Sequence, residues 1–279
     1  MRTDMTKTTP ARTRRTRPHA LRAAGLAVLL SGVVAGCAAN AEDGATSFEP
    51  QVLKKGQLRV CTDMPYEPFE YEDKGEPKGF DIDLVDKVGQ RLSLEPRILD
   101  TDFDAIQSGE ALNAGKCDIA ISAMTITGER ARVLDFSSPY FNASQALVVE
   151  RGSSVESLAD LAGQKVAVQG GTTGELYVTD NAPDSADIVP LPDSAAMDEA
   201  LRKGTVDAAV YDNTVVGDVI ANNSRLSVAA EFDTGEQYGM AVKKDGNVDL
   251  LRTVNDVLAD LRANGGYDKI YEKWFGKTS

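Results

Sequence analysis

The chain has 279 residues, of which 42% are hydrophobic, so it is long enough for two domains with apolar cores. Its formal net charge of −13 at pH 7 argues against binding to nucleic acid or to anionic lipid headgroups. The only histidine is His19, and the three cysteines form no Cys-x-x-Cys pair. Zinc sites and histidine-based catalysis are therefore excluded, and we predict no metal, no cofactor and no catalytic residue.

The first 36 residues are predicted to be an export signal. A basic segment precedes the apolar residues 23–35, which are too few to span a bilayer as a helix. Val34-Ala35-Gly36-Cys37 resembles a bacterial lipobox, which implies cleavage before Cys37 and a diacylglycerol on its thiol. The alternative is an ordinary signal peptide with a chance cysteine. Residues 37–50 are small and polar, which predicts a flexible linker.

Loss of the signal would change the charge of the protein. Residues 1–36 hold seven of the 30 Lys and Arg residues and one of the 43 acidic residues, so the remaining chain carries a formal −19. Such a surface does not attract anionic membranes by itself. The protein is therefore expected at the cell membrane, on its extracytoplasmic face, held only by the lipid on Cys37.

The elements of the first half alternate between strand and helix. The chain begins with a strand at 56–63, and a helix with apolar residues at a 3.6-residue rhythm follows at 79–92. A strand at 95–100, a helix at 103–115 and a strand at 117–124 complete the series. This βαβαβ order predicts a parallel sheet with helices on both faces.

The second half repeats this pattern. The sequence predicts a short helix, then a strand at 165–168, a glycine turn and the start of another helix. Residues 195–220 repeat the arrangement of a helix, a glycine, a strand and a helix cap. A strand at 236–244 and a long amphipathic helix at 249–266 follow, and a short helix at 267–276 closes the chain. The repeat predicts two related lobes.

Two extended segments, 145–152 and 237–244, flank the second unit and are predicted to cross between the lobes. We assign 51–146 plus 241–279 to lobe 1 and 147–240 to lobe 2, with the crossing strands as hinges. Ligands of open α/β sheets bind at the carboxyl ends of the strands, so two facing lobes would share one cleft.

Cys61 and Cys117 remain after lipidation of Cys37, in an exported and oxidising setting. Both are interpreted as strand residues of neighbouring parallel strands. Their sulfur atoms would then lie at different heights, beyond bridging distance. We therefore expect two buried free thiols.

Charged and hydroxyl side chains follow the predicted strands. Thr125 and Arg130 follow one strand, a Gly-Gly-Thr-Thr turn at 170–173 follows another, and Asp63 and Asp212 follow two more. Arginine binds a carboxylate through two parallel hydrogen bonds, and a helix start after a glycine turn also favours an anion. An aspartate suits an ammonium group. The set predicts a site for an α-amino acid zwitterion.

Each of these residues also has a structural interpretation. Arg130 could pair with Asp135 on the surface. The others could be helix caps, turn residues or core aromatics: Thr172, Thr173, Asp212, Asp63, Tyr66 and Phe103. Asp81 and Asp83 are interpreted as helix-start residues that the helix dipole favours.

Four motifs resemble one family. They are "VCTDMPYEPFEYEDKGEPKGFDIDLVDKVGQRL", "DIAISAMTITGERARVLDFSSPYF", "VAVQGGTTGELY" and "YGMAVKK". In this order they resemble the bacterial extracellular solute-binding proteins of family 3, which include glutamine- and histidine-binding proteins. The resemblance implies a two-lobed periplasmic-binding-protein-like fold of type II. It also implies a non-enzymatic, monomeric receptor that passes a free amino acid to the membrane permease of an ABC importer.

The resemblance also assigns the ligand contacts. Arg130, Thr125 and the Thr172-Thr173 turn would hold the α-carboxylate, and Asp212 the α-ammonium. The ligand side chain would lie among the remaining residues, which are Asp63, Tyr66, Phe103, Ala123 and Gln169.

The identity of the ligand is less determined. No further Lys or Arg follows the predicted strands, which argues against an acidic ligand, and Asp63 and Gln169 favour a polar or basic one such as Gln, Arg, His or Lys. Gln169 and Tyr211 stand where the glutamine-binding pattern has lysine and histidine. Two alternatives are an amino-acid sensor and an enzyme on the same fold, such as a cyclohexadienyl dehydratase, that would use acids of the 67–72 segment (Glu67, Glu70 and Glu72).

Overall fold

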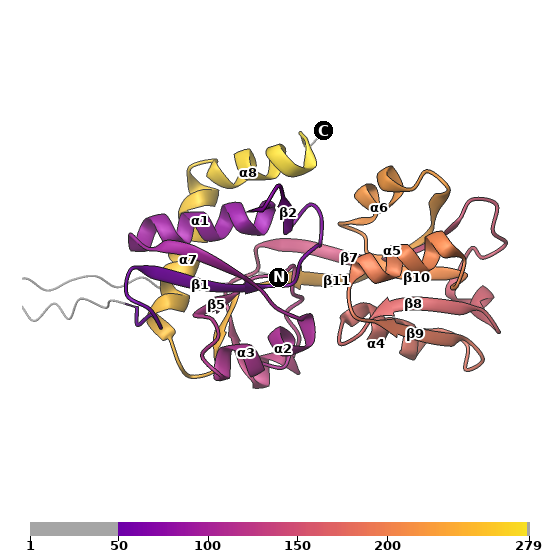
Figure 1. The fold of residues 1–279 in the computed structure, drawn as a ribbon, viewed down its shortest axis with the longest axis horizontal. Helices are drawn as coiled ribbons and strands as arrows, with labels where there is room; N and C mark the ends of the chain where they lie inside the picture. The colour runs from indigo at the N-terminus through magenta and orange to yellow at the C-terminus, as the bar shows by residue number, and fades with distance from the viewer. Residues whose placement is uncertain (1–49, 278–279) are drawn as a thin grey trace, which may run out of the picture. The chain divides into compact units, whose positions relative to one another are not determined.

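The structure, a computed structural model, describes residues 50–277. In this range the chain forms two five-stranded sheets covered by helices (Figure 1). This confirms the predicted α/β class with two open sheets. The predicted signal peptide, Cys37 and the linker up to residue 49 lie outside the described residues. No helix in the described range is both long and apolar enough to cross a membrane.

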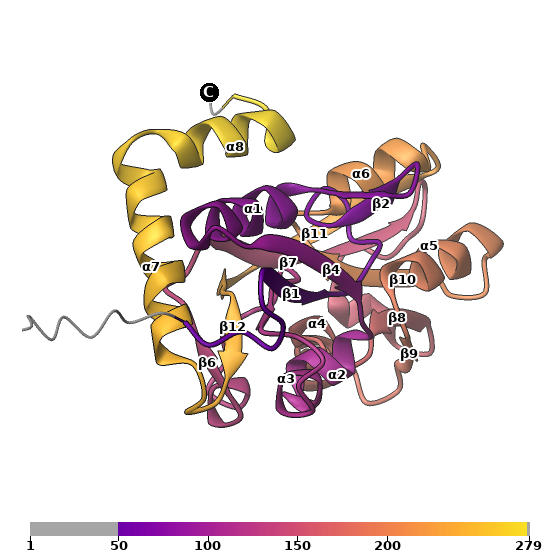
Figure 2. The ribbon, with the colours of Figure 1, turned by 60° about the vertical axis from the view of Figure 1, so that its left-hand side comes forward.

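The first sheet combines early and late parts of the chain. Its strands are β1 (Gln57–Thr62), β4 (Glu95–Asp100), β5 (Ile119–Ala120), β6 (Leu134–Phe136) and β12 (Ala241–Lys243). Their order in the sheet is β4-β1-β5-β12-β6. β1 is parallel to β4 and β5, and β12 is antiparallel to β5 and β6. Figure 2 shows β1 beside β4, and β12 beside β6.

Helices cover both faces of this sheet, because side chains along β1 alternate between two apolar clusters. Leu58 and Val60 pack in the same cluster as residues of α1 (Phe80–Leu92), α7 (Val248–Ala263) and α8 (Gly266–Phe275). Cys61 packs on the opposite side with α2 (Phe103–Gln107) and α3 (Glu110–Asn113). A hairpin of β2 (Tyr71–Asp73) and β3 (Glu76–Lys78) precedes α1.

The second sheet comprises β7 (Phe141–Glu150), β8 (Lys165–Gln169), β9 (Asp187–Leu191), β10 (Ala208–Asp212) and β11 (Leu226–Tyr238). Their order is β11-β7-β10-β8-β9, and β8 is parallel to both β9 and β10. Its helices are α4 (Thr173–Asn181), α5 (Ser194–Lys203) and α6 (Val216–Asn222). Two 3₁₀ turns lie at Arg130–Arg132 and Leu158–Leu161. The parallel strands β8 and β10 place Gln169 and Asp212 at one edge of the sheet.

Two long antiparallel strands, β7 and β11, connect the two sheets (Figure 1). The predicted first crossing segment, 145–152, lies mostly in β7. The second differs from the prediction, because 237–244 holds only the end of β11 and then β12 of the first sheet. β11 was not predicted because residues 227–237 are exposed or half-buried, which leaves no apolar strand pattern. The lobe boundaries drawn from the sequence stay a prediction.

Cys61 and Cys117 form a disulfide, with their Cα atoms 5.7 Å apart. The prediction of two free thiols is therefore wrong. β1 and β5 are neighbouring parallel strands, as assumed, and Cys61 lies opposite Ala120. However, β5 begins only at Ile119 and the chain bends at Asp118. Cys117 thus precedes the strand, and its side chain reaches the cluster that contains Cys61.

Removal of this disulfide is expected to destabilise the protein. The two cysteines are 56 residues apart in sequence, so the double variant Cys61→Ala/Cys117→Ala should lose about 2–4 kcal/mol of unfolding free energy. Thermal unfolding followed by circular dichroism measures the change, and wild-type protein with reductant is the matched control. Equal melting temperatures for the reduced, oxidised and variant proteins would contradict this role of the bridge.

Candidate ligand-binding pocket

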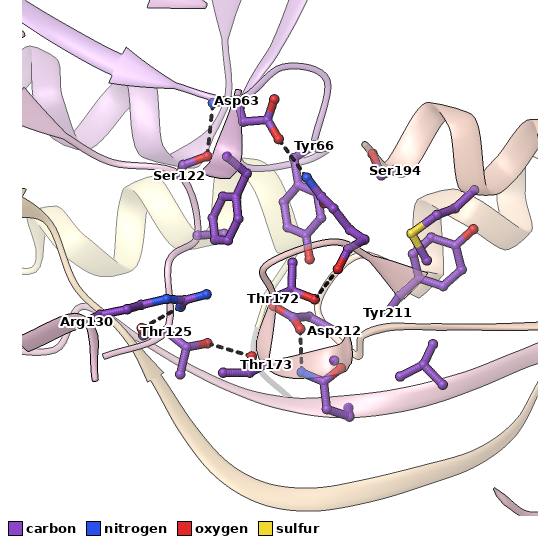
Figure 3. A pocket seen from close by; sticks show the side chains of 17 residues that line it. Asp63, Tyr66, Ser122, Thr125, Arg130, Thr172, Thr173, Ser194, Tyr211 and Asp212 are labelled. Atoms are coloured by element: carbon purple, nitrogen blue, oxygen red, sulfur yellow. Dashed lines mark hydrogen bonds between the residues drawn. The ribbon is translucent and has the colours of Figure 1, made fainter. Parts of the chain in front are cut away.

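One pocket lies between the ends of strands of the two sheets. Figure 3 shows the seventeen side chains that line it. They include all ten residues predicted for ligand contact, namely Asp63, Tyr66, Phe103, Ala123, Thr125, Arg130, Gln169, Thr172, Thr173 and Asp212. The structure thus brings the predicted set together, while their ligand contacts stay a prediction.

Arg130 is a buried cation at the wall of the pocket, with 5% of its surface exposed. Its Nη1 donates to the Thr125 carbonyl at 2.7 Å and its Nη2 to the Gly171 carbonyl at 3.0 Å. Its guanidinium carbon lies 5.1 Å from the centre of the Phe103 ring. Burial lowers the pKa of Arg130 to about 10. The two carbonyls fix the guanidinium plane and leave further N–H groups for an anion.

The alternative pairing of Arg130 with Asp135 is wrong. The Asp135 carboxylate instead pairs with Lys244, whose Nζ lies 2.8 Å away. Among residues 50–277, Arg130 forms no ion pair with any carboxylate. The charges of Asp212 and Glu236 act on the buried guanidinium, but neither carboxylate forms an ion pair with it, so its remaining N–H groups favour an anionic ligand.

The glycine turn after β8 opens α4 beside Arg130. Thr172 is the N-cap of α4, because its Oγ1 accepts from the Glu175 N–H at 3.2 Å. Gly171 has a φ of +73°, and a Cβ there would lie 2.1 Å from Asp104 Oδ1, so glycine is required. The Gly171 N–H donates to Glu175 Oε2 at 2.7 Å. Thr173 and Gly174 line the pocket, and their N–H groups, which have no partner in the described part of the chain, favour an anion close to Arg130.

Asp212, at the end of β10, lies on the other side of the pocket. It accepts from Gln145 Nε2 at 2.6 Å and from the Tyr238 hydroxyl. Burial raises its pKa to about 6, and the nearby charge of Glu236 adds to the rise. Asp212 does not cap α6, whose N-cap is Val215. The capping alternative is therefore wrong, and the carboxylate has no cationic partner in the described part of the chain.

Asp63 follows β1 and carries the third charge of the pocket. Its backbone N–H donates to Ser122 Oγ at 3.0 Å, and its carboxylate accepts from Gln169 Nε2 at 2.8 Å (Figure 3). Burial raises the pKa of Asp63 to about 7, although the bond from Gln169 opposes the rise. Tyr66 and Phe103 line the same pocket. Asp63 therefore has no cationic partner in the described part of the chain. A cationic group of a ligand could pair with it and pack against the rings of Tyr66 and Phe103.

A pair of buried acids supports this wall from behind. Asp81 is fully buried and accepts from the Ala123 N–H at 2.8 Å and the Tyr140 hydroxyl at 2.7 Å. Glu70, also fully buried, accepts from Ser122 Oγ at 2.8 Å. Asp81 and Asp83 lie in the first turn of α1, as predicted, and Asp81 has this second role in addition. Asp81 holds Ala123 at a φ of 41°, at the edge of the pocket.

Sequence reasoning missed three polar lining residues, Ser122, Gln145 and Ser194, and also Glu236, which bonds to Gln145. Gln145 is fully buried in the otherwise apolar middle of β7, which was a signal that could have been used. Glu236 lies on β11 and begins the strand predicted at 236–244, but no motif marked its side chain as part of a site. Gln145 Nε2 donates to both Asp212 Oδ1 and Glu236 Oε1, at 2.6 and 2.9 Å.

Two α/β sheets that are joined by two crossing strands and share one charged pocket define a two-lobed binding protein. The sequence model of the bacterial extracellular solute-binding proteins, family 3, matches residues 58–277. The chain belongs to this family, as the resemblance implied, and the type II fold is confirmed.

Several known proteins are similar over most of the chain. The L-cystine-binding protein TcyJ of Escherichia coli K12 is 30% identical, covering 92% of this chain and 97% of TcyJ. The ABC transporter arginine-binding protein 1 of the same strain is 34% identical, covering 75% of this chain and 87% of that protein. The solved structure of an ancestral arginine-binding protein bound to arginine is 42% identical, with a TM-score of 0.75, and covers 80% of this chain and 99% of its own.

Proposed function

We propose that this protein is an extracytoplasmic receptor that binds an amino acid with a cationic side chain, most readily L-arginine, and delivers it to an ABC permease. The observation that carries the proposal is the presence of three charges around one pocket, Arg130, Asp63 and Asp212, none of which is ion-paired in the described range. Membership in family 3 supports transport as the role. The arginine-binding relatives support the ligand.

Each of the three charges matches one group of arginine. The α-carboxylate would lie between Arg130 and the start of α4, where the N–H groups are unpaired. The α-ammonium would lie against Asp212. The guanidinium would then reach Asp63, between the aromatic residues Tyr66 and Phe103.

The balance of charge favours a cationic ligand over a neutral or acidic one. Arg130 provides one positive charge against the two carboxylates of Asp63 and Asp212. The raised pKa values of both carboxylates show that a cation near them would stabilise their ionised forms. Glutamine would pair only one of them, and glutamate would add a repulsive charge at Asp63.

No observation favours the enzyme alternative. Neither Glu67, Glu70 nor Glu72 lines the pocket. Glu70 is bonded to Ser122 inside the protein. A general acid or base must reach the substrate, and these three groups do not meet that requirement.

Calorimetric titration with L-arginine, L-glutamine and L-glutamate tests the proposal. We expect wild-type affinity to decrease in that order. Asp63→Asn should weaken L-arginine binding by about tenfold or more and leave L-glutamine within about threefold, because only the cationic side chain loses its partner. Asp187→Asn, which removes an exposed charge on β9, is the control. If wild type prefers L-glutamate, the assignment of Asp63 and the proposed ligand class are wrong.

The attachment to the membrane is part of the same proposal. The motif at 34–37 supports a lipid on Cys37, and the acidic remainder of the chain gives no other means of attachment. Cys37→Ala should leave an uncleaved precursor or release the protein from membranes. Detergent-phase partitioning and mass spectrometry of the N-terminus measure this. A wild-type N-terminus that starts beyond Cys37 would refute the anchor.

A further inference from the structure

We infer that Glu236, behind the pocket on β11, is a positioning residue that makes the α-ammonium subsite a set of hydrogen-bond acceptors. The inference rests on the proposed function and names a residue that orients the ligand backbone. Glu236 is not among the lining residues of the pocket. It acts through three residues that do line the pocket: Thr125, Thr173 and Gln145.

The Glu236 carboxylate is held by four hydrogen-bond donors. Its Oε2 accepts from Thr125 Oγ1 and Thr173 Oγ1, each at 2.7 Å. Its Oε1 accepts from Gln145 Nε2 at 2.9 Å and Thr234 Oγ1 at 2.8 Å. Although burial opposes ionisation, these bonds lower the pKa of Glu236. The group is therefore an anion that only accepts hydrogen bonds.

The two threonine hydroxyls are oriented by this anion. A hydroxyl has one hydrogen, and Thr125 and Thr173 both give theirs to Glu236. Their oxygens are 3.4 Å apart, and towards any further group they can only accept. Thr125 follows β5 of the first sheet and Thr173 begins α4 on the second, and the two side chains lie next to each other (Figure 3). The Glu236 carboxylate therefore orients hydroxyls from both sides of the pocket.

Gln145 is oriented in the same sense. Both hydrogens of its amide are used, one by Asp212 Oδ1 and one by Glu236 Oε1. Its Oε1 is buried and has no hydrogen-bond partner in the described part of the chain. Gln145 Oε1, the Thr125 and Thr173 oxygens and the Asp212 carboxylate together form a group of hydrogen-bond acceptors beside the Glu236 anion. An ammonium, with up to three N–H donors, suits such a group, and a carboxylate does not.

The inference changes two ligand contacts that the family resemblance implied. The Thr125 and Thr173 hydroxyls would accept from the α-ammonium, where the resemblance had both residues hold the α-carboxylate. The carboxylate would then depend on Arg130 and the start of α4 alone. Glu236 thereby fixes which end of the amino acid enters each subsite.

The test separates the two ends of the ligand. Glu236→Gln keeps the size of the side chain but replaces one acceptor oxygen by an N–H donor. Either a threonine hydroxyl or the Gln145 amide must then turn and present a hydrogen to the pocket. L-arginine and agmatine, which lacks the carboxylate, should both lose about tenfold or more in affinity. 5-Guanidinopentanoic acid, which lacks the α-amino group, should change by less than about threefold. Competition calorimetry against wild type measures all three.

Two further variants complete the design. Glu231→Gln removes an exposed carboxylate from the same strand and should change none of the three affinities. Thr173→Val removes one acceptor and should repeat the ligand pattern of Glu236→Gln, which keeps the test valid if the latter does not fold. Equal losses for all three ligands, or no loss for agmatine, would overturn the inference. Failure of wild type to bind L-arginine would instead count against the proposed function.

Discussion

Arg130→Ala is expected to weaken L-arginine binding by about 2–5 kcal/mol, because the α-carboxylate loses its proposed cationic partner, a guanidinium that is itself buried. Loss should be similar for any other α-amino acid that binds, since every such ligand has this carboxylate. Titration calorimetry measures the effect.

Two matched variants show whether the effect belongs to the guanidinium. Arg130→Lys keeps the charge but cannot hold two carbonyls and a carboxylate in one plane, so it too should lose much of the affinity. Arg132→Ala removes an exposed arginine from the same 3₁₀ turn and should bind as wild type does. Near-wild-type binding by Arg130→Ala would refute the carboxylate site.

Binding of L-arginine should weaken strongly as the pH falls from 7 to 5. The pKa values of Asp63 and Asp212 are raised to about 7 and about 6, and the ligand cations require both groups ionised. Below these values each proton competes with the ligand, so affinity should fall by about tenfold or more over this interval. Binding at pH 6 should release protons, which calorimetry in buffers of different ionisation enthalpy detects. A flat affinity from pH 7 to 5 would contradict the assignment.

The same two groups set a pH dependence of stability without ligand. Their pKa values are raised above the usual 3.8 in the folded protein, so their contribution to stability is full below about 3.8. It is lost as the pH rises through about 6 to 7. The ligand supplies the missing cations, so the rise in melting temperature with L-arginine should be largest at pH 7 and above. Asp63→Asn should reduce this dependence.

Regular packing made much of the fold predictable. The helix α1 has apolar residues at helical spacing because it packs on one sheet face. The alternation of strand and helix indicated parallel sheets, but only β4-β1-β5 and β10-β8-β9 are parallel, and both sheets are mixed because β7, β11 and β12 pair antiparallel to their neighbours. β11 could not be predicted, since its side chains are largely exposed and its stability comes from pairing with β7. The bend at Asp118 likewise left no sequence signal, and the disulfide of Cys117 was missed for that reason.

The site was predictable where local rules decide it. Polar residues at strand ends converge, which brought Asp63, Arg130 and Asp212 to one pocket. Contacts between distant segments could not be predicted in this way. The roles of Gln145 and Glu236 depend on hydrogen bonds to Asp212, Thr125 and Thr173. Only the folded chain brings these groups together.

A crystal structure of the protein with L-arginine tests the central claim most directly. We expect the α-carboxylate on Arg130, the α-ammonium against Asp212 with the Thr125 and Thr173 hydroxyl oxygens, and the guanidinium at Asp63. A ligand bound outside this pocket, or bound within it with the guanidinium at Asp212 and the α-ammonium at Asp63, would contradict the account.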